Sequence, residues 1–238
     1  RPSVWQRDLP ACVSLYGDSY TYGFEVAAEE AWGSVLSESL ECRVANYGVV
    51  GYGTDQAYFR FRRNESDQAR LIILGIYHEN IVRVVNQYRF LINAGDPFTF
   101  KPRMRLEGSG MLNEIPLPVG ELTDIGNVIR FPKRHLTEEW FLPETPEGPV
   151  RVTFPFSVTI FRALNARRVR NGLRNRPSWI DFYDPDHPSH ALATMVAIVR
   201  SFAELAAERQ RKFLVVIVPA PSSIRFHRER GENPAQSL

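Results

Sequence analysis

The chain has 238 residues, of which 44 % are hydrophobic and 24 % are charged, and its formal net charge is +2. This composition is typical of a soluble globular protein, and the length suits one domain or one domain with a large insertion. A net charge this close to zero gives no global field that would recruit nucleic acid or an anionic membrane, so we expect no nucleic-acid partner. No run reaches the roughly 18 apolar residues that a membrane span needs, so we expect no membrane span.

The two cysteines, Cys12 and Cys42, each lie inside an apolar stretch. Unpaired cysteine is among the residue types most often found in protein interiors. We therefore expect two buried free thiols. Two cysteines alone do not identify the redox compartment.

The first third of the chain alternates between short apolar runs, typical of buried strands, and runs with helical spacing of apolar residues. Thr54 is a suitable N-cap for the second helix. The pattern predicts, in chain order, a strand at 11–16, a helix at 29–40, a strand at 42–47, a helix at 54–63 and a strand at 71–76. Alternation of this kind is typical of a parallel sheet covered by helices on both faces.

The alternation then stops, because eight of the 17 prolines lie between Pro97 and Pro149. We interpret 90–150 as an irregular insertion with a hairpin near 103–117, in a single domain that spans 1–238. Regular structure returns after the insertion. The pattern predicts a helix at 158–173, a helix at 188–209 with Pro188 in its first turn, and a strand at 213–218.

Polar clusters follow three of the predicted strands, at 17–19, 46–55 and 78–80. In a parallel doubly wound sheet, ligands bind beyond the carboxyl ends of the strands. The topology alone therefore predicts that these three clusters converge on one site.

The first two clusters resemble motifs of the SGNH/GDSL hydrolases. Gly17 to Gly23 reads G-D-S-Y-T-Y-G directly after the first strand, and Asn46 to Asp55 reads N-Y-G-V-V-G-Y-G-T-D after the second. The resemblance covers roughly 11–90 and 180–220. It implies a three-layer, flavodoxin-like α/β fold with strand order 2-1-3-4-5, in which the fifth strand is missing or distorted in this chain.

By this resemblance Ser19 is the nucleophile, and the backbone N–H groups of Ser19 and Gly51 form part of an oxyanion hole. The side chain of Asn80 is the best match for the third donor. Here the chain departs from the family, because Gly75-Ile-Tyr-His-Glu-Asn80 replaces the usual Gly-x-Asn-Asp. The alternatives are a tight turn with a helix cap at 17–19, a turn role for Gly51, and an N-cap role for Asn80.

The family keeps an Asp-x-x-His motif near its C-terminus, and this motif is not found at the expected place. One explanation is that the base lies beyond the sequence given. A second is that Asp184 and His187, which stand in the Asp-x-x-His at 184–187, supply it. The same acidic and histidine residues could instead hold a metal ion or cap the following helix, and we favour capping. We interpret His78 as a solvated loop histidine.

The resemblance implies hydrolysis of an acyl ester, with an O-acetylated carbohydrate as the expected substrate class and without a cofactor. An acyltransferase that uses the same site, and a non-catalytic carbohydrate-binding relative, are the two rival functions. Six arginines between Arg162 and Arg176 suit either an anionic ligand or a solvated helix face, and we favour the solvated face. The oligomeric state cannot be read from the sequence.

Overall fold

The computed structural model of the chain describes residues 9–93, 95, 99–121, 124–143, 145–174, 176–231 and 233–238. The chain divides into two compact units. The first unit holds the described residues up to Arg83 together with Thr194–Pro221, and the second holds Val84–Ala193 and Ser222–Leu238. That the whole chain folds as a single domain stays a prediction.

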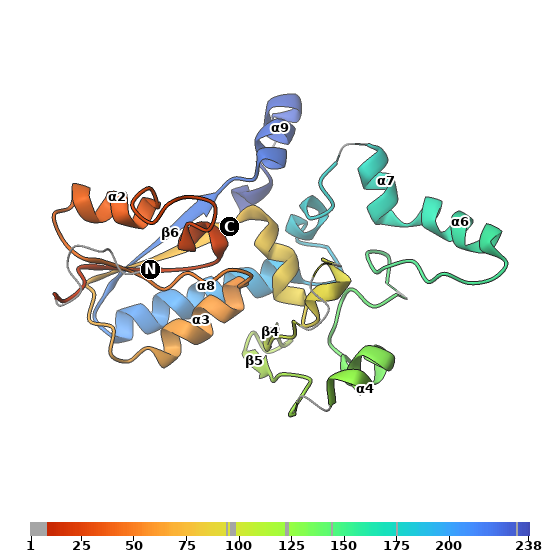
Figure 1. Cartoon of the computed structure of the whole chain (residues 1–238), viewed down its shortest axis with the longest axis horizontal. Coiled ribbons are helices and arrows are strands. Elements are labelled where there is room, and N and C mark those ends of the chain that lie inside the picture. Colours follow the sequence, from red (N-terminus) through yellow and green to blue (C-terminus); the bar gives the residue numbers. More distant parts are fainter. Residues whose placement is uncertain are drawn as a thin grey trace. The chain divides into compact units, whose positions relative to one another are not determined.

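The first unit is built on a four-stranded parallel sheet with the order β2-β1-β3-β6. Figure 1 labels its strand β6. This arrangement confirms the predicted α/β fold with a parallel sheet. The strands are β1 (Val13–Tyr16), β2 (Val44–Asn46), β3 (Leu71–Tyr77) and β6 (Lys212–Val218). Each begins or ends within two residues of its predicted bounds.

One face of the sheet packs against α2 (Trp32–Ser39). Leu15 and Ile73 point to this face and are buried with the partly buried Trp32 and Leu36 of the helix. The helical spacing of Trp32 and Leu36 thus places both on the side that contacts the sheet.

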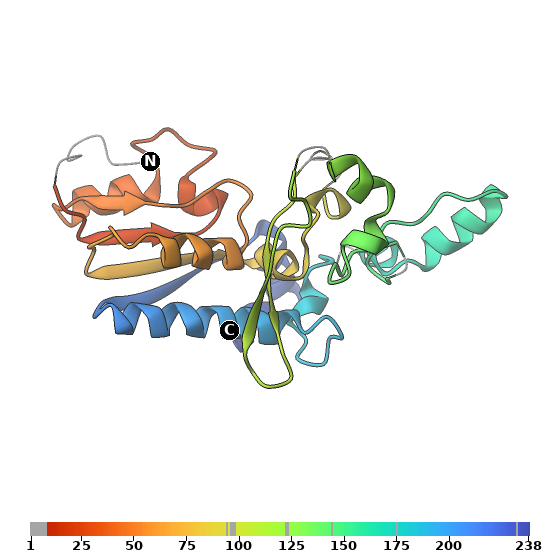
Figure 2. The same ribbon diagram turned by 90° about the horizontal axis from the view of Figure 1, so that it is seen from below.

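The opposite face packs against α3 (Thr54–Arg63) and α8 (Ala191–Glu208), which lie side by side in Figures 1 and 2. Tyr16 of β1 contacts Phe61 of α3 and Phe202 of α8, with ring centroids 5.1 and 6.0 Å apart. Because helices cover both faces, the strands read as continuous apolar runs.

Three details of the helices differ from the sequence prediction. Gly53 is the N-cap of α3, so Thr54 is its first helical residue. α8 begins at Ala191 rather than near Pro188, and the Ser189 hydroxyl accepts its first N–H. The helix expected at 158–173 is two helices, because the chain leaves helical geometry at Ala166.

Cys12 and Cys42 form a disulfide bond, so the expectation of free thiols is wrong. Backbone pairing explains why the two meet, since the N–H of Cys12 donates to the carbonyl of Arg43 at the start of two neighbouring strands. Apolar surroundings in the sequence did not distinguish a buried thiol from a pair brought together by strand register.

We expect the double variant Cys12→Ser, Cys42→Ser to lose about 3.5 kcal/mol of unfolding free energy, because the disulfide closes a loop of about 30 residues. Urea denaturation of the variant and of the oxidised protein measures this loss. Reduction of the unaltered chain should reproduce it, whereas equal midpoints before and after reduction would contradict it.

The carboxyl ends of β1 and β3 lie close to the short helix α1 (Ser19–Tyr22). A Cβ on Gly17 would lie 2.1 Å from Oγ1 of Thr21, and a Cβ on Gly75 would lie 2.2 Å from the same atom. Side chains at either position would therefore displace α1. The two glycines let the helix that carries Ser19 sit directly on the strand ends.

The second unit contains the predicted hairpin, formed by the antiparallel strands β4 (Arg103–Leu106) and β5 (Leu112–Ile115). Its remaining elements are short. They are the 3-10 helices η2 (Arg89–Leu91), η4 (Ile180–Tyr183) and η5 (Pro234–Ser237), and the α-helices α4 (Ile125–Arg130), α5 (Pro132–His135), α6 (Phe156–Asn165), α7 (Arg167–Leu173) and α9 (Pro221–Arg230). These are elements of the described residues only, and the interpretation of 90–150 as an insertion stays a prediction.

A buried carboxylate holds two separate segments of the second unit together. Glu139 is 5 % exposed and accepts hydrogen bonds from the backbone N–H groups of Gln87, Tyr88 and Phe141. The Asn86 side chain donates to the same carboxylate. These bonds give polar partners to backbone groups that regular secondary structure leaves without any.

Candidate active site

Ser19 is the first residue of α1, directly beyond the carboxyl end of β1. As the first residue of a helix it has a backbone N–H with no intrahelical partner. Its side chain is half-buried. The helix cap that the alternative interpretation of 17–19 expected is present, because Asp18 is the N-cap of α1.

Asp18 links the start of α1 to Asn80. Its Oδ1 accepts hydrogen bonds from the N–H groups of Tyr20 and Thr21, at 2.9 and 3.3 Å. Its Oδ2 accepts a hydrogen bond of 2.8 Å from the side-chain amide of Asn80. Asp18 is 1 % exposed, so these bonds replace the water that the carboxylate would otherwise bind.

Asn80 is the third residue of η1 (His78–Val85), which follows β3. It is therefore not an N-cap of that helix. Its side chain is 1 % exposed, and Oδ1 has no hydrogen-bond partner among the described residues. The Asp18 bond uses one of the two amide hydrogens of Asn80.

Gly51 lies in the loop after β2, with a φ of 87° that favours glycine. The loop continues directly into α3, so Gly51 also follows the carboxyl edge of the sheet. Three sequence-predicted residues, Ser19, Gly51 and Asn80, therefore belong to the first unit and follow β1, β2 and β3 respectively.

A pocket of about 310 Å³ adjoins Ser19. Tyr20, Phe24 and Trp32 contribute aromatic side chains to its wall, and Glu25 and Glu30 contribute carboxylates. Two contacts fix the wall. The Tyr20 ring stacks on Tyr77 with centroids 4.0 Å apart, and the Trp32 indole N–H donates to the Tyr20 carbonyl.

Sequence reasoning did not predict this pocket. The signal was present, because aromatic residues follow the G-D-S motif at positions 20, 22 and 24 and return at Trp32. Alternation of aromatic and carboxylate residues just after a nucleophile motif is a pattern that could have indicated a substrate pocket.

His78 is 5 % exposed, so its interpretation as a solvated loop histidine is wrong. It is the first residue of η1, at the end of β3. Burial lowers the pKa of its imidazole below the ordinary value, which keeps the ring neutral at pH 7. Of the five histidines, His78 is the one that belongs to the first unit.

Asp184 and His187 belong to the second unit, and their side chains are not paired with each other. The Asp184 carboxylate accepts the N–H of Asp186, whereas Nδ1 of His187 lies 2.7 Å from the Ser189 hydroxyl. The His187 ring is 4 % exposed, with Nε2 3.8 Å from a Glu147 carboxylate oxygen. Neither of these contacts reaches the first turn of α8, and the capping role expected for the cluster stays a prediction. A catalytic role for the pair stays a prediction.

The environment of His187 is nevertheless charged. Burial alone would raise the pKa of the Glu147 carboxyl. His187, Arg167 and Trp140 lower it by more than burial raises it, so the pKa lies below the usual range. Arg167 pairs with the same carboxylate at 2.9 Å. Glu147 is thus held as an anion beside the His187 ring.

Within the described ranges, no three His, Cys, Asp or Glu side chains gather closely enough to hold a metal ion. No helix in the described part of the chain is long and apolar enough to cross a membrane.

The fold and these residues define an α/β protein with a polar site at the carboxyl edge of its parallel sheet. No protein-family model matches the chain, and no curated protein matches it. Among solved structures, the crystal structure of AlinE4, an SGNH-hydrolase family esterase, is similar over 32 % of this chain and 44 % of that chain. The identity is 22 % and the TM-score is 0.28. The chain thus matches less than half of that esterase, and similarity at this level does not establish a family.

Proposed function

We propose that the chain is a serine esterase that forms an acyl-enzyme on Ser19. The observation that carries this proposal is the Asp18 carboxylate, which holds the first turn of α1 and the Asn80 side chain at once. Two groups that are 61 positions apart in the sequence are thereby held at one edge of the sheet. A nucleophile and a fixed amide donor are two of the parts that acyl transfer needs.

The Ser19 hydroxyl would attack the carbonyl carbon of the ester. Negative charge then develops on the carbonyl oxygen and needs donors that are already in place. The backbone N–H of Ser19, the N–H of Gly51 and the second amide hydrogen of Asn80 are the donors that we propose. The Asp18 bond would fix the Asn80 amide before substrate arrives.

The pocket beside Ser19 supports a substrate with an apolar face and hydroxyl groups. Aromatic side chains such as Tyr20 and Trp32 stack on the flat faces of sugars or acyl chains, and Glu25 and Glu30 can accept hydrogen bonds from hydroxyls. An acylated carbohydrate fits this chemistry, which agrees with the substrate class expected from the resemblance.

The proton of Ser19 needs an acceptor, and two histidines are candidates. His187 belongs to the only Asp-x-x-His in the chain, and His78 belongs to the same unit as Ser19. A neutral imidazole is required in either case, and the lowered pKa of His78 meets this condition at pH 7.

A fluorophosphonate probe, which reacts with activated serines, tests the proposal. We expect the chain to be labelled, Ser19→Ala to lose labelling, and Ser66→Ala, which changes an exposed serine elsewhere, to keep it. Loss in either His78→Gln or His187→Gln identifies the base. An unlabelled chain, or labelling that persists in Ser19→Ala, would contradict a Ser19 nucleophile.

A further inference from the structure

The second unit contains a strongly basic segment, Pro149–Ile180, which includes α6 and α7. It has seven arginines and no aspartate or glutamate. The whole chain has a net charge of only +2, so the rest of the chain is acidic overall. The small net charge of the whole chain therefore does not exclude a local positive field at this segment.

The apolar face of α6 is exposed. Phe156, Ile160, Phe161 and Leu164 recur at helical spacing, and they are 61, 61, 70 and 57 % exposed. No residue of this helix is buried. An amphipathic helix in a globular protein normally turns such a face to the core. Here that face is available to a partner.

The residues on either side extend this surface. Phe154 precedes α6 and is 87 % exposed, and Leu173 ends α7 and is 75 % exposed. Large side chains of this kind seldom gather on a surface without a role in binding. The basic segment therefore combines an exposed apolar strip with positive charge.

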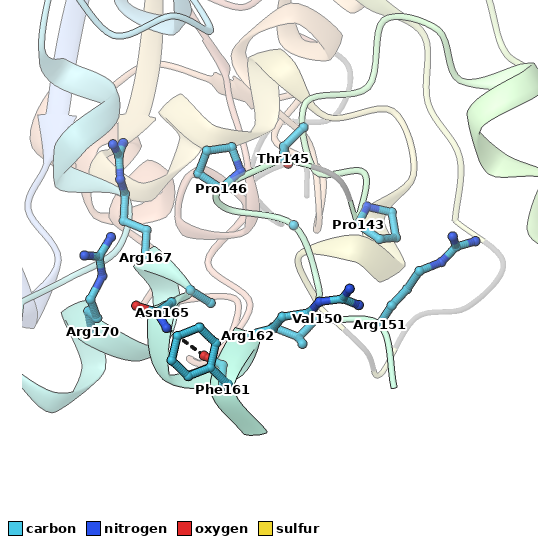
Figure 3. A pocket seen from close by; sticks show the side chains of 12 residues that line it. Pro143, Thr145, Pro146, Val150, Arg151, Phe161, Arg162, Asn165, Arg167 and Arg170 are labelled. Atoms are coloured by element: carbon cyan, nitrogen blue, oxygen red, sulfur yellow. Dashed lines mark hydrogen bonds between the residues drawn. The ribbon is translucent and has the colours of Figure 1, made fainter. Parts of the chain in front are cut away.

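The arginines also border a pocket of about 730 Å³, which Figure 3 shows. Arg162, Arg167 and Arg170 come from α6 and α7, and Arg151 lies on the opposite side of the pocket. Phe161 lies beside them in the same wall. Guanidinium groups bind phosphate oxygens, so the pocket suits a phosphate group next to an apolar phase.

The positive charge of the basic segment and its exposed apolar side chains together indicate which class of partner it binds. Contact between this segment and the same segment of a second copy would bring arginines against arginines, although Arg167 and Arg176 have carboxylate partners of their own, Glu147 and Asp181. Nucleic acid would satisfy the arginines but leave the four apolar side chains of α6 in water. A bilayer with anionic headgroups satisfies both, because basic residues contact the phosphates while apolar side chains enter the acyl boundary.

We propose that the basic segment Pro149–Ile180 binds the surface of anionic lipid membranes, with the apolar face of α6 inserted and the arginine-lined pocket holding a lipid phosphate. The protein then lies on the membrane rather than across it. Ser19 belongs to the other unit, and none of the observations above concerns it, so this proposal does not depend on the proposed function.

Co-sedimentation with phosphatidylglycerol–phosphatidylcholine vesicles tests the proposal, with pure phosphatidylcholine vesicles alongside. We expect binding to the anionic vesicles that weakens as salt is raised. Arg162→Gln with Arg170→Gln should lower the partition coefficient about 30-fold, since each arginine near such a surface contributes about one factor of five. The charge-matched control, Arg225→Gln with Arg228→Gln on α9, should bind like the unaltered chain.

The apolar half of the proposal has its own variant. Ile160→Ser with Leu164→Ser should lower the partition coefficient at least about tenfold, and Met111→Ser with Leu117→Ser, which removes exposed apolar groups elsewhere, should not. Equal binding to both kinds of vesicle, no binding to either, or unchanged binding in both basic-segment variants would overturn the proposal. Tighter binding to single-stranded DNA than to vesicles would also overturn it, in favour of a polyanion site.

Discussion

Replacement of Asn80 by alanine is expected to lower kcat for a p-nitrophenyl ester by about 100- to 1000-fold with little change in KM. The proposed oxyanion donor acts on charge that exists only in the transition state, so its loss should leave ground-state binding intact. Steady-state kinetics of the purified variant measure both constants.

Asn80 also binds Asp18, so the kinetic loss must be separated from a loss of folded protein. Asn86→Ala is the matched control, because Asn86 is equally buried and its amide also donates to a carboxylate, but in the second unit. Urea denaturation of both variants gives the folded fraction. A drop in kcat that only follows the folded fraction, or one that Asn86→Ala shares, would remove Asn80 from the oxyanion hole.

Replacement of Glu139 by alanine is expected to lower the unfolding free energy of the second unit by about 4 kcal/mol, because it leaves three backbone N–H groups in the interior without an acceptor. Each such group costs about 1–3 kcal/mol, and water that enters the vacated space offsets part of the total. Chemical denaturation followed by tryptophan fluorescence measures the change.

The neighbouring Glu138 provides the control. Its carboxylate pairs with Arg105 in a bridge whose side chains are 32 and 42 % exposed. Surface pairs contribute about 1 kcal/mol or less, so Glu138→Ala should shift stability only slightly. Comparable losses in both variants would mean that charge, rather than the hydrogen bonds of the buried carboxylate, explains the effect.

The sheet could be predicted from the sequence because its strands are short apolar runs, and β1, β2 and β3 are largely buried. Leu71–Tyr77 is apolar throughout, and its short length and its isoleucines favour a buried strand over a helix. The break at Ala166 could not be predicted, since the residues on both sides have good helical spacing and only the backbone leaves the helix. The start of α8 was misplaced because Pro188 is compatible with a first turn but does not require one.

The positions of the candidate site residues along the sheet edge could be predicted from the topology. The contacts that their side chains make could not. Ser19, Gly51 and Asn80 each follow one of three adjacent strands. In any parallel sheet, residues that follow neighbouring strands lie at the same edge. The bond from Asn80 to Asp18 depends on the rotamer of each side chain. The environment of His187, buried among aromatic rings and beside Glu147, comes from residues up to 47 positions away that no local pattern connects.

The contact between Gly17, Gly75 and Thr21 has a consequence for the evolution of this chain. The Cβ of an alanine at position 75 would be too close only to Oγ1 of Thr21. Replacement of Thr21 by alanine removes that oxygen, so Gly75→Ala can be accepted together with Thr21→Ala. At position 17 the carbonyl oxygen of Gly75 would still lie 2.6 Å from the new Cβ. Among diverged relatives, positions 21 and 75 should therefore covary, while position 17 should remain glycine.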